Sequence, residues 1–284
     1  MRLFATLILT LIPYLGQGQD SSPRVNEFPF QSKEGLIWIQ VNTPKSPKPL
    51  NFLVDSGAGV SVVALDVAQQ LGLKLGHRVN VRGVGTATKG YWPQHIAASV
   101  GDVRLPEDYL AVDLSNLSRA CTFGVDGLLG ADFFATHVVQ IDFKAQIIRL
   151  LKSSTPDTES EVVPLEFRSC GLRLPIRVNG GKPQWVRLDT GCATALQWVT
   201  SKVDFKNCSR QPAIGMDVLS IPMTQTTVHL GRSDFIAVPT GLHAKEIFAG
   251  EAGLLGNGLL SRYARVTIDA AEGRLVLEKE LVSH

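Results

Sequence analysis

The chain has 284 residues, of which 44% are hydrophobic and 19% are charged. This balance is typical of a well-packed globular protein and excludes an intrinsically disordered chain. The length suffices for one large domain or two of ordinary size. The formal net charge is only +2 and there is no run of basic residues, so we expect no nucleic-acid partner.

The first residues have the pattern of an export signal. Arg2 precedes an apolar stretch over residues 3–15, and two glycines stand before a cleavage site near Gln19. The stretch is too short to span a membrane comfortably. We therefore expect a signal peptide over residues 1–18. The mature chain would be extracytoplasmic, either periplasmic or secreted, with no stable membrane anchor after cleavage.

After a short N-terminal segment over residues 19–32, one motif occurs twice: an apolar strand that runs into Asp, a small hydroxyl residue and Gly. The first copy is Asp-Ser-Gly at residues 55–57, and the second is Asp-Thr-Gly at residues 189–191. Each copy ends a hairpin that starts at a glycine, Gly35 or Gly171, and crosses a turn rich in Pro, Gly or Asn. Matching hairpins of nearly equal length indicate an internal repeat.

A second block closes each half of the chain. Gly-Leu-Leu-Gly occurs at residues 127–130 and 253–256, and each copy is followed by two further strand-like runs. We therefore predict an all-β fold with two similar lobes, residues 33–152 and 162–284. The polar segment at 153–161 is the expected linker. Helix is scarce, and residues 64–71, followed by a stop at Gly72, are the best candidate.

The two aspartates give the repeat a chemical meaning. If the lobes bring Asp55 and Asp189 into contact, both carboxyls cannot easily ionise, because two like charges repel at short range. The pair would then share one proton, so that one carboxyl can act as a base while the other acts as an acid.

Together these motifs resemble those of the aspartic protease superfamily, and most of all the retropepsin-like aspartyl proteases of bacteria, here as a tandem two-lobe chain. The features that carry the resemblance are the two Asp-Ser/Thr-Gly triplets, the downstream Gly-Leu-Leu-Gly segments and the Gly-Val-Gly stretch at 83–85. They cover roughly residues 30 to 280. The resemblance implies that each lobe is a retropepsin-like β-barrel and that the active-site cleft lies between the two lobes.

The resemblance implies a role for each matching residue. Asp55 and Asp189 would be the catalytic pair. The hydroxyls of the next residues would join a hydrogen-bond network that locks the two active-site loops together. The glycines after them would let the backbone turn tightly beneath the carboxylates. The last glycine of each Gly-Leu-Leu-Gly segment would lie where that segment crosses close beside an active-site loop. These supporting residues are Ser56, Gly57, Thr190, Gly191, Gly130 and Gly256.

The resemblance further implies an exported aspartic endopeptidase that acts on polypeptide substrates. A water between the two carboxyl groups would attack the peptide carbonyl, with no metal, no cofactor and no covalent intermediate. We expect a monomer, because one chain supplies both aspartates. The short segment before the first strand predicts no long inhibitory pro-segment of the pepsin type.

The glycine-rich stretch at 79–90 is open to three interpretations. Its glycine spacing is that of a phosphate loop, but Tyr91 follows where Lys would be needed, and no helix pattern continues. A mobile flap over the substrate, with Gly83, Val84 and Gly85 at its tip, fits the resemblance better. The remaining interpretation is an ordinary surface hairpin. The second lobe has no such glycine pattern around residues 215–225, which predicts a single functional flap.

The chain also departs from the family pattern. Ala58 and Cys192 stand three residues after the aspartates, where pepsin-like enzymes have a hydroxyl, and this predicts raised pKa values for the pair and a milder pH optimum. Ala195 in the second lobe replaces Ser61 of the first. These departures support the alternative of a catalytically silent protein that binds a peptide or glycan, or inhibits another enzyme. A chance pair of turns in an unrelated β protein is the third interpretation.

The four cysteines, Cys121, Cys170, Cys192 and Cys208, allow three disulfide pairings in an exported protein. None forms a Cys-x-x-Cys pair, so the sequence predicts no zinc site. For Cys192 a buried thiol and a disulfide both stay open.

Overall fold

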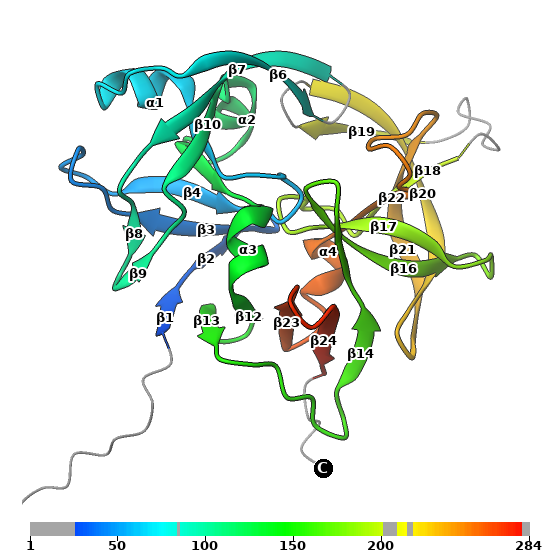
Figure 1. Cartoon of the computed structure of the whole chain (residues 1–284). Coiled ribbons are helices and arrows are strands. Elements are labelled where there is room, and N and C mark those ends of the chain that lie inside the picture. Colours follow the sequence, from blue (N-terminus) through cyan, green and yellow to red (C-terminus); the bar gives the residue numbers. More distant parts are fainter. Residues whose placement is uncertain (1–25, 84–85, 201–208, 215–217, 280–284) are drawn as a thin grey trace, which may run out of the picture.

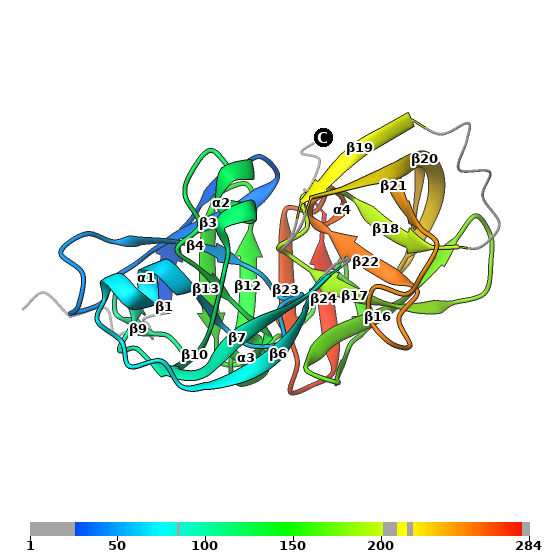
Figure 2. The same cartoon turned by 90° about the horizontal axis from the view of Figure 1, so that it is seen from above.

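The computed structural model describes residues 26–83, 86–200, 209–214 and 218–279. The predicted signal peptide and the first half of the N-terminal segment, residues 19–25, lie outside these residues. The described chain folds into two β-rich lobes that stand side by side, with a shared sheet beneath them (Figures 1 and 2). This confirms the predicted all-β class with two similar lobes. No helix in the described part is long and apolar enough to cross a membrane.

The first lobe is built on an eight-stranded sheet with the order β2-β3-β4-β11-β5-β10-β7-β6. Its strands are β2 (Gln31–Lys33), β3 (Leu36–Val41), β4 (Leu50–Val54), β5 (Val62–Ala64), β6 (His77–Gly83), β7 (Thr86–His95), β10 (Asp108–Val112) and β11 (Gly127–Leu129). A small sheet of β8 (Ser99–Val100) and β9 (Val103–Arg104) and the helices α1 (Leu65–Gln70), α2 (Ser115–Ala120) and α3 (Ala131–Thr136) complete the lobe.

The second lobe has an eight-stranded sheet with the same kind of strand order, β15-β16-β17-β22-β18-β21-β20-β19. Its strands are β15 (Glu166–Arg168), β16 (Gly171–Val178), β17 (Gln184–Asp189), β18 (Leu196–Val199), β19 (Ser209–Ile214), β20 (Val218–Leu230), β21 (Ser233–His243) and β22 (Gly253–Gly256), and helix α4 (Asn257–Leu260) follows. Every strand of one sheet therefore has a counterpart at the same place in the other.

A six-stranded sheet joins the two halves. It consists of β1 (Asn26–Pro29), β13 (Ile147–Leu151), β12 (Val138–Asp142), β23 (Arg265–Asp269), β24 (Arg274–Glu278) and β14 (Glu161–Pro164), in that order. The antiparallel pair β12–β23 sets Val139 opposite Ile268, and both side chains are fully buried. The closing strands thus form one common sheet rather than one per lobe, because pairing β12 with β23 leaves neither with an open edge.

The strands that carry the aspartates run through the middle of each sheet. Strand β4 is paired in parallel with β11, and β17 with β22. Parallel strands are buried on both faces and are continuously apolar, as the runs at 52–54 and 127–129 are. Gly127 is required there, because a Cβ on it would lie 2.3 Å from the Phe52 ring. The polar Asp-Ser/Thr-Gly triplets begin where these apolar strands end.

The helix expected at 64–71 is confirmed as α1, and Gly72 ends it with φ +64°. No comparable signal marks α2, α3 and α4 in the sequence. Although α2 and α3 have six residues like α1, these three helices end at Cys121, His137 and Ser261 rather than at a glycine stop.

Candidate active site

The two aspartates meet between the lobes. Asp55 follows β4 and Asp189 is the last residue of β17, and their carboxyl groups are hydrogen-bonded to each other. Each carboxyl also lies against the glycine of the opposite loop. A Cβ on Gly57 would lie 2.4 Å from Cγ of Asp189, and a Cβ on Gly191 would lie 2.4 Å from Cγ of Asp55. The Asp55 loop and the Asp189 loop are therefore in van der Waals contact.

The resemblance implied that Gly57 and Gly191 allow a tight backbone turn, but the structure shows a different reason for glycine at these positions. Neither Gly57 nor Gly191 has a φ in the left-handed region. Alanine could adopt both backbone conformations, but its methyl group would occupy the space of the facing carboxyl. The glycines thus permit the close approach of the aspartates rather than a special turn.

The hydroxyls of Ser56 and Thr190 tie the two loops together by four hydrogen bonds. Ser56 Oγ donates to the Leu188 carbonyl at 2.8 Å and accepts from the Thr190 amide at 3.1 Å. Thr190 Oγ1 donates to the Val54 carbonyl at 2.8 Å and accepts from the Ser56 amide at 2.9 Å. Both side chains are fully buried, so each hydroxyl satisfies two backbone groups of the other lobe that water does not reach.

The pKa values of both aspartates are raised, and burial is the largest cause for each. Asp55 Oδ1 accepts hydrogen bonds from the amides of Gly57 at 3.0 Å and Ala58 at 3.1 Å, which favour its charged form. Asp189 Oδ1 accepts only from the Gly191 amide, at 3.0 Å. The charge of Asp55 also raises the pKa of Asp189, which lies well above its usual range. The two carboxyls are therefore unequal.

Cys192 occupies the position where pepsin-like enzymes carry a hydroxyl. Its thiol faces Thr194, with Sγ 3.1 Å from Oγ1, and burial raises its pKa to about 12. The raised pKa values of the aspartates agree in direction with the expectation from Ala58 and Cys192, although burial is the main cause. Within the described residues, Cys121, Cys170 and Cys192 are free thiols, and Cys208 lies outside them.

The Gly-Leu-Leu-Gly segments do cross the active-site loops closely. A Cβ on Gly130 would lie 2.4 Å from the Val60 carbonyl, and one on Gly256 would lie 2.2 Å from the Thr194 carbonyl. In the first lobe Ser61 fixes this crossing, because its hydroxyl donates to Asp132 and accepts from the Gly130 amide. In the second lobe Ala195 has no hydroxyl, and its carbonyl accepts directly from the Gly256 amide at 3.1 Å.

Three polar residues at the site were not anticipated. Arg187 and Glu251 form a buried ion pair, and Arg187 Nη1 donates to the carbonyl of Gly57 in the other lobe at 3.0 Å. Asn257 Nδ2 donates to the carbonyls of Thr190 and Gly35, and so also joins the lobes. A position-by-position comparison of the two repeats would have found the ion pair, because the equivalent residues of the first lobe are apolar.

The flap candidate is only partly visible. Gly83 is the last residue of β6 and is paired with Thr86 of β7 in a long hairpin at the edge of the first sheet. Val84 and Gly85, the rest of the candidate, lie outside the described residues. The structural counterpart in the second lobe is the pair β19–β20.

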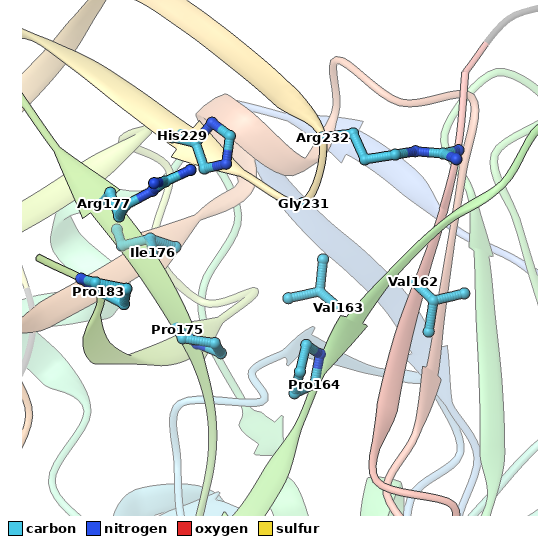
Figure 3. A pocket seen from close by; sticks show the side chains of 10 residues that line it. All are labelled: Val162, Val163, Pro164, Pro175, Ile176, Arg177, Pro183, His229, Gly231 and Arg232. Carbon is cyan, nitrogen blue, oxygen red and sulfur yellow. The ribbon is translucent and has the colours of Figure 1, made fainter. Parts of the chain in front are cut away.

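A pocket on the outer side of the second lobe is separate from the paired carboxyls. It is lined by β14, β16 and β20, with Val163 of β14 on one side and Ile176 and His229 on the other (Figure 3). His229 is bound to Asp234, and Arg232 donates to backbone carbonyls at 159 and 160. No group of three possible metal ligands occurs in the described parts of the chain.

Comparisons with known proteins agree with this arrangement. Residues 39–133 match a family model described as aspartyl protease, a span that includes Asp55 and ends before Asp189. No curated protein sequence matches the chain. Among solved structures, an aspartic proteinase from Irpex lacteus has a similar fold, with a TM-score of 0.59 and 12% identity, over 92% of this chain and 99% of that one.

The sequence match covers the first lobe, and the structural likeness extends over both. The fold is that of a pepsin-like aspartic proteinase, and the facing Asp-Ser/Thr-Gly loops stand between its two lobes. Residues 39–133 thus match the aspartyl protease family model, and the fold over both lobes is similar to that of an aspartic proteinase.

Proposed function

We propose that the protein is an aspartic endopeptidase that hydrolyses peptide bonds with a water activated between Asp55 and Asp189. The family match and the fold support a protease of the aspartic type. The observation that carries the finer proposal is the contact between the two carboxyls, each seated on the glycine of the opposite loop. Their raised pKa values allow the pair to keep one proton under mildly acidic conditions.

The different surroundings of the two carboxyls suggest which one acts as the base and which one acts as the acid. Asp55 receives two backbone amide hydrogen bonds and Asp189 receives one, so the negative charge is better stabilised on Asp55. In the resting pair the proton would reside on Asp189. Asp55 would then take a proton from the attacking water while Asp189 donates its own to the carbonyl oxygen of the substrate. The pair titrates as a unit, with two apparent pKa values that belong to both residues.

Cleavage of a diverse peptide mixture, followed by mass spectrometry from pH 3 to pH 8, tests this proposal. We expect internal cleavage by the wild-type protein and none by Asp55→Asn or Asp189→Asn. Asp102→Asn is the matched control, because this carboxyl lies on the exposed turn between β8 and β9 and should not affect cleavage. A folded wild-type protein that binds peptides but cleaves none would favour the silent binding protein instead.

We also propose that the protein acts outside the cytoplasm as a monomer. The apolar leader at 3–15 supports export, and the presence of both aspartates in one chain supports action without a second copy. The mass of the protein recovered from the cell exterior should correspond to a chain that begins near Gln19. Recovery of the full-length chain from the cytoplasm alone would contradict export, and activity that falls on dilution with dissociation of a dimer would contradict the monomer.

A further inference from the structure

The second lobe carries a buried ion pair directly behind the paired carboxyls. The guanidinium of Arg187 holds Glu251 by two parallel bonds, Nε to Oε2 and Nη2 to Oε1, each 2.8 Å long. The side chains are only 5% and 4% exposed. The ring of Phe248 covers the guanidinium, with its centroid 3.7 Å from Cζ. The remaining nitrogen, Nη1, reaches across to the Gly57 carbonyl of the other lobe at 3.0 Å.

The space around this guanidinium is tightly filled. A Cβ on Gly171 would lie 2.5 Å from Cζ of Arg187, so the hairpin of the second lobe has glycine where the guanidinium passes. The planar fork of Arg is thus fixed on several sides at once. Lys could not reproduce this arrangement, because its single ammonium lacks the two-pronged geometry.

In the first lobe, the positions equivalent to Arg187 and Glu251 carry buried apolar residues. Leu53 stands two residues before Asp55, as Arg187 stands two before Asp189, and both are paired with the middle of a Gly-Leu-Leu-Gly strand. Val125 stands two residues before Gly127, as Glu251 stands two before Gly253. Leu53 and Val125 are each 2% exposed. At equivalent positions, one lobe therefore has an apolar pair and the other an ion pair.

This difference has an energetic implication. Removing two charges from water is costly, and replacing a buried ion pair by well-packed apolar residues is often neutral or stabilising. The first lobe shows that this frame accepts the apolar solution. The ion pair in the second lobe is therefore poorly explained by stability alone, and its contact with the Gly57 carbonyl directs attention to the active-site loop.

The charge of Arg187 also acts on the carboxyls. It lowers the pKa of Asp55 and of Asp189, and so offsets part of the increase that burial causes. The charged groups that surround the guanidinium come from four elements: Glu251 before β22, Asp189 at the end of its own strand, Asp55 in the facing loop, and Arg173 on β16, which is bound to Glu166. Arg187 is the cation of this group that touches an active-site loop.

We propose that Arg187, held in place by Glu251, is a positioning residue for the two aspartates. It fixes the Asp55 loop to the second lobe through the Gly57 carbonyl and places one positive charge beside both carboxyls. This proposal rests on the proposed endopeptidase function for its kinetic test. The titration of the carboxyls tests it without any need for cleavage.

The central experiment gives the second lobe the residues of the first. In the double variant Arg187→Leu/Glu251→Val the ion pair is replaced by the apolar pair. We expect a midpoint of urea unfolding close to that of the wild type, because the apolar pair avoids the cost of two buried charges while the Gly57 carbonyl loses its hydrogen bond. We expect kcat/KM at the wild-type optimum to fall about tenfold or more, because the Asp55 loop loses its anchor. Both limbs of the pH–rate profile should move to higher pH, since a charge that lowers both pKa values is gone.

Two further variants separate an electrostatic role from a merely structural one. Glu251→Gln leaves the charge of Arg187 unneutralised, so the pH limbs should move to lower pH, opposite to the double variant. Arg173→Leu is the matched control, because it removes the neighbouring cation on β16 that has its own partner in Glu166. It should leave the pH profile unchanged. If either single substitution prevents folding, the double variant and the control still decide the question.

The second measurement is the titration of the aspartate side chains, followed by the ¹³Cγ chemical shifts of Asp55 and Asp189. Their midpoints should rise in the double variant and fall in Glu251→Gln. A folded double variant with wild-type midpoints and pH limbs would overturn the proposal, and so would an equal shift in Arg173→Leu. If the wild-type protein cleaves no peptide, the proposed endopeptidase function fails, and these titrations still decide the role of Arg187.

Discussion

Replacing Thr190 by Val tests whether the buried hydroxyls lock the two lobes together. Valine has nearly the shape of threonine, so the substitution removes two hydrogen bonds without opening a large cavity. Thr190 Oγ1 accepts from the Ser56 amide at 2.9 Å and donates to the Val54 carbonyl at 2.8 Å. Both backbone groups belong to the facing loop and would lose their partner in a buried place.

The expected cost follows from the number of orphaned groups. A buried backbone group without a partner costs about 1–3 kcal/mol, so two of them predict a loss of about 2–6 kcal/mol in the free energy of unfolding. Ser56→Ala removes the symmetric pair of bonds, to Leu188 and Thr190, and should cost a similar amount. The double variant should cost less than the sum, because loops that have already separated no longer depend on the second hydroxyl.

Urea unfolding, followed by tryptophan fluorescence, measures these costs. With a slope of about 3 kcal/mol per M, the midpoint of Thr190→Val should fall by about 0.7–2 M. Thr88→Val, at a partly exposed position in the edge hairpin, is the control and should leave the midpoint nearly unchanged. A midpoint of Thr190→Val within about 0.3 M of the wild type, at an unchanged slope, would refute the reasoning, because the lost bonds would then contribute little.

Three other predictions concern the aspartates and their surroundings. Gly191→Ala should lower kcat/KM by about a hundredfold, because its Cβ would lie 2.4 Å from Cγ of Asp55, whereas Gly124→Ala, with open space around it, should not. Because the pKa of Asp189 is raised in the folded protein, its contribution to the stability of the wild type is fully present below the ordinary pKa and is lost as pH rises through the folded pKa. Urea unfolding should therefore show Asp189→Asn becoming more stable than the wild type between pH 4 and pH 8. An opposite trend would contradict the raised pKa. Burial raises the pKa of Cys192 to about 12, so peptide mass mapping should find its thiol unmodified by iodoacetamide at pH 8 in the native protein and modified after unfolding.

The sequence was informative about the strands that lead to the aspartates. The apolar run at 52–54 and the two Gly-Leu-Leu-Gly segments are continuous, as central parallel strands are, whereas Arg187 interrupts the run before residue 189. This local signal needs no tertiary context. The same holds for α1, because Gly72 marks its end in the sequence. The β12–β23 pairing was not predictable, because strand partners from different halves leave no mark on local periodicity.

The polar residues around the aspartates were harder to read. Arg187 lies in an apolar strand, and its charge alone would suggest an exposed position, yet its partner Glu251 is 64 residues away. The reason for Gly57 was likewise hidden, because the carboxyl that occupies the space beside it comes from the other lobe. Contacts between distant segments decide both cases. A sequence pattern records the presence of such residues and leaves open what they touch.

In the proposed mechanism, the two lobes provide similar frames for two carboxyls that must behave differently. Matching strand orders and reciprocal hydroxyl bonds would, by themselves, give each aspartate the same surroundings. A symmetric pair would have no preference for which member holds the shared proton. The asymmetry comes from a few differences within the common frame: a hydrogen bond from the Ala58 amide to Asp55, a thiol at Cys192 where the first lobe has Ala58, and a buried cation at Arg187. Divergence of the second lobe from the first can thus assign the acid and the base without any change in fold.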